Sequence, residues 1–238
     1  MPEAPSMAID SAARECDSDF MTGSPSSEIG APRPAWRMLR LLVLAALALF
    51  VIRTALLALQ SPWQLDDFPE ALAIKAELLP WTFALHMITG GLALLLVPLT
   101  FLLRRRPRWH RPVGRVTTAI VVLAGLSAFP VALTAPVTRV SAWGFAAQGA
   151  IWLVLLTLGL QQIRARRPRR HRAFMLLMAA VTTGAVFFRI YLALWAIWGD
   201  FRHYEAFYAA DAWLAWTLPL AAMAIFLKQT GGFRGDPR

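Results

Sequence analysis

Four polar side chains in apolar parts of the sequence lie at spacings that bring them to one level of a membrane. His86 is about six residues into the second apolar run, which places it roughly 9 Å below the interface at 1.5 Å per residue. Arg189 lies about nine residues before the end of the fifth run, roughly 14 Å from the same face. Arg53 lies near the end of the first run, and Asp211 opens the sixth run at that face.

An arginine inside a membrane costs at least a few kcal/mol, so it normally faces a bundle interior, a partner or water. Gly90 shares a helical face with His86, and Thr182 shares one with Arg189; small and hydroxylated residues let a helix or a ligand approach closely. The pattern therefore predicts a polar pocket in the outer leaflet that binds or moves a small or amphipathic ligand. The predicted pocket residues are His86, Arg189, Arg53, Asp211, Gly90 and Thr182.

Two alternatives to the pocket remain open. His86 and Arg189 could bond neighbouring backbone carbonyls and fix helix packing, while Arg53 extends its charged end outward along apolar surface. Alternatively, these side chains could face the lipid.

Two basic boxes form an internal repeat. Residues 105–111 read RRPRWHR and residues 166–172 read RRPRRHR, with six of seven positions identical at an offset of 61 residues. Each box joins an even-numbered run to the next, which is compatible with duplication of a two-helix hairpin, although basic, Pro-broken loops also converge easily. The box residues of interest are His110, Arg111, Gly114, Arg115, His171 and Arg172.

The box histidines allow two interpretations. They are either polar anchors at the level of the lipid head groups or a paired site. In the second case, two imidazoles and neighbouring guanidinium groups would bind an anionic head group, a phosphate or a haem propionate.

Six apolar runs must position these residues. Each is about 20 residues long, which matches the hydrocarbon thickness of a bilayer, and 58% of the chain is hydrophobic. Because unpaired backbone groups in lipid cost several kcal/mol, we expect an all-α polytopic membrane bundle of six transmembrane helices over residues 37–228. Pro130 predicts a kink in the third run, and the fifth run is the longest. The runs cover residues 38–59, 80–103, 116–135, 142–163, 173–198 and 209–227.

Charge predicts the orientation of the bundle. The two basic loops carry six arginines each, whereas the loops on the other side carry Lys75, Arg139 and Arg202, one basic residue apiece. The positive-inside rule then places the basic loops and both termini in the cytoplasm. We expect the spans to lie in a bacterial inner membrane, with anionic lipid head groups as partners.

The two ends of the chain are predicted to be tails. Residues 1–36 lack the apolar segment of a signal peptide and are predicted to be a disordered cytoplasmic tail, and residues 229–238 are predicted to be a short cytoplasmic tail. Since the net charge of +10 follows this topology, nucleic acid is not an expected partner.

The polar residues also carry a resemblance to a known family. The sequence resembles a bacterial family of predicted multi-span membrane proteins known only as a domain of unknown function, over roughly residues 40–228. That family has an intramembrane histidine, an HR-x-x-GR box and an HR-x-WM-like box; here Phe174 stands where the family usually has tryptophan. The resemblance implies the helical bundle and the importance of the matching residues, but no reaction. The matching segments are His86-x-x-x-Gly90, His110-Arg111-x-x-Gly114-Arg115, His171-Arg172-x-x-Met175 and Arg189.

Several function classes lack support. The sequence has no GxxxxGK[ST], HExxH or GxSxG motif, and its single cysteine, Cys16, provides no Cys-based metal site. We therefore expect a non-enzymatic membrane protein without a metal site. Haem b is the alternative cofactor, because the sequence is also loosely similar to di-haem b-type membrane cytochromes. Those proteins pair histidines on neighbouring helices, whereas His86 has no histidine partner within the apolar runs. A structural or assembly role is the third hypothesis.

Overall fold

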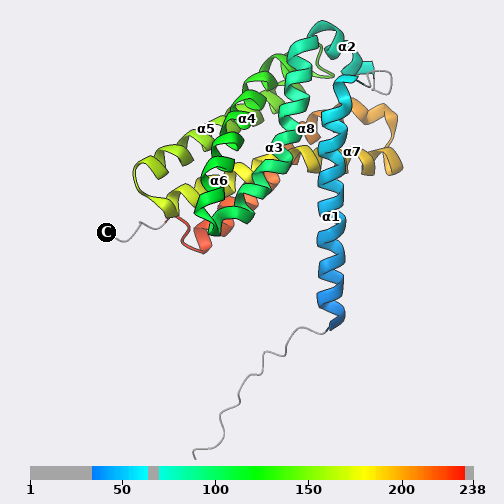
Figure 1. Cartoon of the computed structure of the whole chain (residues 1–238). Coiled ribbons are helices and arrows are strands. Elements are labelled where there is room, and N and C mark those ends of the chain that lie inside the picture. Colours follow the sequence, from blue (N-terminus) through cyan, green and yellow to red (C-terminus); the bar gives the residue numbers. More distant parts are fainter. Residues whose placement is uncertain (1–33, 64–69, 234–238) are drawn as a thin grey trace, which may run out of the picture. The chain divides into compact units, whose positions relative to one another are not determined.

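A computed structural model describes residues 34–63 and 70–233 of the chain, and every regular element within these ranges is a helix (Figure 1). Six of the described segments are long and apolar enough to cross a membrane, which confirms the predicted all-α bundle of six transmembrane helices. The candidate spans are Met38–Trp63, Pro80–Arg105, Pro107–Leu133, Arg139–Arg164, Pro168–Trp198 and Phe201–Gln229.

The chain divides into two units, residues 1–44 and residues 45–238. Helix α1 (Pro34–Gln60) begins in the first unit, three residues before the predicted start of the transmembrane domain, and continues into the second. Residues 1–33, most of the predicted disordered tail, lie outside the described residues, as does the end of the predicted C-terminal tail. The second unit holds all the other described elements, which are η1 (Ser61–Trp63), α2 (Glu70–Leu78), α3 (Pro80–Leu102), η3 (Leu103–Arg105), α4 (Pro107–Leu133), α5 (Arg139–Arg164), α6 (Pro168–Thr182), α7 (Gly184–Trp198), η4 (Phe201–His203) and α8 (Tyr204–Gln229).

Neighbouring helices in the sequence pack side by side. Helix α3 packs on α4, α4 on α5 and α5 on α6, while α8 packs against α5, α6 and α7. The core they share includes Val121, Leu156, Leu177, Val181 and Leu227, all of them buried. This packing leaves large apolar side chains of the outward faces exposed, as expected where lipid is the solvent.

Proline is the first residue of α1, α3, α4 and α6. Pro80, Pro107 and Pro168 are the first residues of α3, α4 and α6, where the missing N–H group costs no hydrogen bond. Helix α4 continues through Pro130 to Leu133.

The two basic boxes have the same local structure. Arg106 and Arg167 precede their helices with nearly equal dihedral angles, φ −120° and ψ 82° against φ −111° and ψ 73°. The Nδ1–H of His110 donates to the carbonyl of Thr100 at 3.0 Å, and the Nδ1–H of His171 donates to the carbonyl of Gly159 at 2.8 Å. Each histidine thus links the start of one helix to the end of the helix before it. This equivalence supports duplication of a hairpin.

The fifth span, Pro168–Trp198, is the longest of the candidate spans, as the sequence predicts, and it has one local irregularity. It is divided between α6 and α7 at Thr183, where Val186 N–H bonds the Thr183 carbonyl three residues back. The side chains of Thr182 and Thr183 donate to the carbonyls of Met178 and Ala180. Threonine hydroxyls that bond the preceding turn bend helices, and the following glycine stabilises a helix poorly, so the sequence Thr-Thr-Gly accounts for the break.

Gly91 allows α3 to approach α1 closely. A Cβ atom at this position would lie 2.9 Å from the carbonyl oxygen of Ala55 and 3.2 Å from Cγ of Leu59. Gly114 in α4 is a useful contrast, because its Cβ would meet only Cγ2 of Thr100, at 3.9 Å.

We expect Gly91→Ala to lower the thermal unfolding midpoint of the purified protein, because the added methyl group forces α1 and α3 apart. Overpacking of this kind costs about 1–3 kcal/mol. The matched control is Gly114→Ala, which gains the same helix propensity without a clash and should leave the midpoint unchanged or slightly raised. Equal midpoints for the two variants would contradict this packing.

Candidate functional site

The break in the fifth span is held by side chains of α5. The Nε2 amide of Gln148 donates to the carbonyl of Val181 at 3.2 Å, and the indole Nε1 of Trp152 donates to Oγ1 of Thr182 at 2.9 Å. Within a membrane the backbone groups at a helix break need such partners, because water is not there to supply them. Helix α5 therefore stabilises the irregular backbone beside the candidate site.

Gly184, the first residue of α7, lets two helices reach the break. A Cβ atom here would lie 2.6 Å from Nε2 of Gln148 and 2.8 Å from Cβ of Trp216. A larger residue would displace the amide of Gln148, which bonds the carbonyl of Val181, or it would displace helix α8. Glycine at this position therefore allows α5, α7 and α8 to approach one another closely.

His86 is fixed by one ring nitrogen. Its Nδ1–H donates to the carbonyl of Ala124 in α4 at 3.1 Å, with the hydroxyl of Ser127 at 3.4 Å from the same nitrogen. Because a carbonyl can only accept, Nδ1 carries the proton in this contact and a neutral ring keeps Nε2 as an acceptor. One ring nitrogen of His86 thus bonds a neighbouring helix, as the packing interpretation expects, and the residue also lines a cavity.

Arg189 lies one turn into α7 and folds back along its own helix. Its Nη1 donates to the carbonyl of Ala185 at 2.8 Å, which uses one of five guanidinium N–H groups. Within residues 34–63 and 70–233, no carboxylate forms an ion pair with Arg189. His86 and Tyr208 line the same cavity as Arg189.

These side chains line an internal cavity of about 380 Å³. Helices α1 to α8 all contribute to its walls, which are mainly apolar and include Leu94, Ala128, Val131 and Phe188. Polar groups on the walls include Lys75, His86, Gln148, Thr182, Arg189 and Tyr208. An apolar cavity of this size with a few convergent polar groups is typical of small-molecule sites.

Tyr208 belongs to an aromatic cluster on the cavity wall. Its ring contacts Phe188 and Phe145 edge to face, at centroid distances of 5.3 and 6.0 Å, and these two phenylalanines contact each other at 5.2 Å. Tyr208 lines the cavity and precedes Asp211 by three residues, about one turn of α8.

Gly90 opens onto the cavity, unlike its neighbour Gly91. A Cβ atom at Gly90 would have no atom within 4 Å, although the residue is only partly exposed and lines the cavity. The structure thus brings together four of the predicted pocket residues, His86, Gly90, Thr182 and Arg189.

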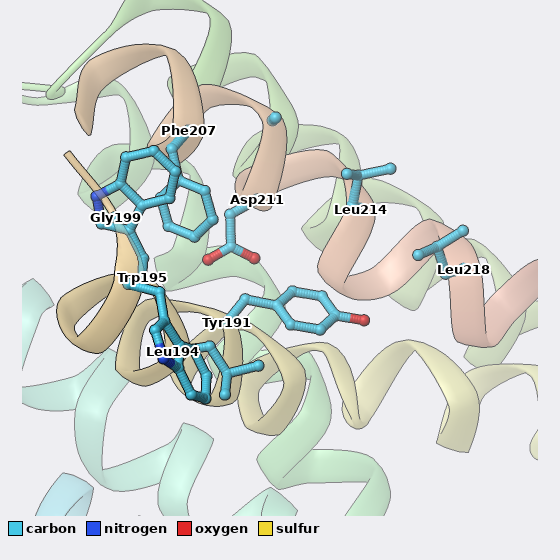
Figure 2. A pocket seen from close by; sticks show the side chains of 10 residues that line it. Tyr191, Leu194, Trp195, Gly199, Phe207, Asp211, Leu214 and Leu218 are labelled. Carbon is cyan, nitrogen blue, oxygen red and sulfur yellow. The ribbon is translucent and has the colours of Figure 1, made fainter. Parts of the chain in front are cut away.

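The other two predicted pocket residues lie elsewhere. Arg53 is exposed on α1 and does not line the cavity, which agrees with the alternative in which its charged end extends outward. Asp211 lines a separate pocket between α7 and α8, shown in Figure 2. Helical depth alone could not separate these residues, because it does not specify which side of each helix faces the bundle.

The residues of the two basic boxes lie outside the cavity lining. Arg111, Arg115 and Arg172 are exposed, and Gly114 is half-buried without a close neighbour. The two box histidines each bond the preceding helix of their own hairpin, as described above.

Lys75 is a polar cavity residue. In the sequence it is notable only as the single basic residue of the loop before the second apolar run. It is buried on α2, and its ammonium group donates to the carbonyls of Val131 and Thr134 at 2.9 and 2.6 Å. A cation at this position satisfies carbonyls at the C-terminus of α4 and opposes the helix dipole. The signal in the sequence was weak: one lysine, in a short segment rich in acidic residues.

Lys75 lies outside the candidate spans, and burial holds its pKa below the ordinary value of 10.5. Between that lowered pKa and 10.5 the unfolded chain binds more protons than the folded protein, so Lys75 makes the free energy of unfolding rise with pH in this window.

We expect Lys75→Met to reduce this increase of the free energy of unfolding with pH, measured by thermal unfolding across the alkaline range. Lys228→Met, which removes an exposed lysine at the end of α8, is the control and should leave the slope unchanged. Parallel profiles for the wild type and Lys75→Met would show that the buried lysine does not titrate as described.

The chain matches a model of a known protein family. The model of the family "Predicted membrane protein (DUF2306)" matches residues 83–227, which is more than half of the chain and includes the sequence from α3 to α8. No curated protein and no solved structure matches the chain. The matched range contains His86, Arg189 and both basic boxes, whereas Arg53 and Lys75 lie before it.

Proposed function

Because the chain belongs to the DUF2306 family of predicted membrane proteins, whose function is unknown, we propose a function from the cavity itself: the protein binds a small amphipathic ligand within the membrane. The observation that carries the proposal is the guanidinium group of Arg189, which lines an apolar cavity without an ion pair to a carboxylate of the described residues. A cation at this depth is costly unless something compensates it, and a bound anion would do so.

The lining defines the chemistry of the ligand. Arg189 offers hydrogen-bond donors to a carboxylate or phosphate, and Nε2 of His86 offers an acceptor. The remaining walls suit an apolar body. At about 30 Å³ per water-sized group, a cavity of about 380 Å³ holds roughly a dozen non-hydrogen atoms. A medium-chain carboxylate such as decanoate has this size and this division into an anionic head and an apolar chain.

The irregularity between α6 and α7 lies on the cavity wall. Irregular backbone at membrane depth is tolerated where it is buried in protein or lines a cavity. Here Thr182 and Gly184, on either side of the break, both line the cavity. A change at the break would therefore alter the cavity wall directly.

We expect decanoate to bind the purified protein saturably in isothermal titration calorimetry. Arg189→Gln should weaken binding about tenfold or more, because a charge-assisted hydrogen bond contributes roughly 1.5–3 kcal/mol. Gly90→Leu should abolish binding by filling the cavity, without lowering the thermal unfolding midpoint. The matched control is Arg202→Gln, at an exposed arginine of η4, which should bind decanoate like the wild type.

Several outcomes would count against this function. If Gly90→Leu and Arg189→Gln bound decanoate as the wild type does, binding would not involve the cavity. If both variants instead failed to accumulate in the membrane, the structural or assembly hypothesis would be favoured. The haem hypothesis requires a Soret band that shifts on dithionite reduction, whereas ligand binding in the cavity does not.

We also propose a bacterial inner membrane as the location, with both termini in the cytoplasm. The support is the arginine-rich boxes on one side of the spans, against single basic residues on the other. The Arg189 cavity then opens toward the outer leaflet.

Alkaline phosphatase fused after Arg238 should be inactive in this orientation, and a green fluorescent protein fused there should fluoresce. The same two reporters inserted into the loop at Gly199 should give the opposite result. An active phosphatase at the C-terminus would reverse the orientation, and with it the leaflet that the cavity faces.

A further inference from the structure

The carboxyl group of Asp211 is buried without a partner. The residue is 2% exposed, and neither of its carboxylate oxygens has a hydrogen-bond partner among the described residues. Buried polar groups almost always have partners, so an exception needs an explanation. Asp211 lines a pocket of about 480 Å³ that is distinct from the Arg189 cavity, and its oxygens point into the space between α7 and α8 (Figure 2).

Aromatic rings form the walls around this carboxylate. Trp195 of α7 stacks on Phe207 of α8, with ring centroids 4.2 Å apart and an interplanar angle of 14°. Tyr191 lies on the other side of the Asp211 oxygens (Figure 2). Trp198 also lines the pocket. Aromatic faces attract cations through their quadrupole, most strongly when the cation is shielded from water. The pocket therefore combines a buried carboxyl group, which a cation would hold in its ionised form, with surfaces that favour positive charge.

The mouth of the pocket is apolar and faces outward. Trp198 is 76% exposed, and Leu214 and Leu218, one and two turns after Asp211 on α8, are 46% and 51% exposed. In a bilayer these side chains contact lipid chains. A ligand reaching Asp211 from this side must carry an apolar body that lies along Leu214 and Leu218.

We propose that this pocket binds an amphipathic organic cation, with an ammonium group against Asp211 and an apolar chain along α8. A divalent metal ion fits less well, because Ca²⁺ takes six to eight oxygen ligands and Asp211 is the one carboxylate in the pocket lining. An alkylammonium group needs one counter-charge and aromatic contacts, and both are present. The site extends the function beyond the Arg189 cavity and does not depend on it.

The test uses octyltrimethylammonium, titrated into the full-length protein in a non-ionic detergent. Saturable binding is expected, with octanol binding at least tenfold more weakly because it lacks the charge. Asp211→Asn keeps the shape of the side chain and should weaken octyltrimethylammonium binding at least tenfold. Asp200→Asn, which changes an exposed aspartate near the same end of α8, is the matched control and should have no effect. Gly90→Leu fills the other cavity and should also have no effect, so the two sites are tested separately.

A second variant keeps the test decisive if Asp211→Asn does not accumulate. Trp195→Leu removes one aromatic wall and should weaken binding of the cation several-fold while octanol binding stays the same. Wild-type affinity in either variant would overturn the proposal.

Competition identifies the natural source of the cation. Displacement by dihexanoyl phosphatidylethanolamine, but not by dihexanoyl phosphatidylglycerol, would assign the site to a lipid head group. Displacement by octylamine alone would assign it to a free amphipathic amine. Either pattern supports an ammonium site, whereas equal displacement by the phosphatidylglycerol lipid would show that charge does not determine binding and would overturn the proposal.

Discussion

Backbone carbonyls need donors wherever the helices of this membrane protein are irregular, and long polar side chains provide them. Gln148 bonds the carbonyl of Val181 beside the break in the fifth span, and Lys75 bonds two carbonyls at the end of α4. His86, His110 and His171 each donate to a carbonyl of another helix. Lipid offers no hydrogen bonds, so a polar group left unpaired at this depth costs several kcal/mol. The contacts of Gln148 and Lys75 pair carbonyls at irregular positions, and the contacts of the three histidines pair their imidazole N–H groups. The first role of these polar residues is therefore structural. Their remaining polar atoms are available for ligands.

His86 and Arg189 show how one residue serves both purposes. The sequence left three interpretations open, a ligand pocket, a packing role and exposure to lipid, as though the first two excluded each other. In the structure Nδ1 of His86 bonds α4 and one guanidinium nitrogen of Arg189 bonds its own helix. The rest of each side chain faces the cavity. Fixing a side chain by one of its polar atoms also orients the others, which is what a binding site requires.

The sequence was sufficient for the spans and for part of the site. The lengths of the apolar runs predicted six helices. The positions of His86 and Arg189 along their helices predicted that both lie at a similar depth, and both line one cavity. Depth did not define rotation about the helix axis, so Arg53 was grouped with a cavity that it does not line. Asp211 was grouped there for the same reason, although it faces a separate pocket between α7 and α8. The break at Thr183 depends on side-chain bonds to the preceding turn, which hydropathy does not detect.

The histidine contacts of the basic boxes join residues close in sequence: His110 reaches back ten positions to Thr100, and His171 twelve positions to Gly159. Each link can form as soon as its own turn has been synthesised, without any other part of the protein. Two hairpins made in this way would leave the ribosome already closed at their arginine-rich ends. Biogenesis would then proceed by joining finished pairs, and the contacts of α8 with α5, α6 and α7 would come last.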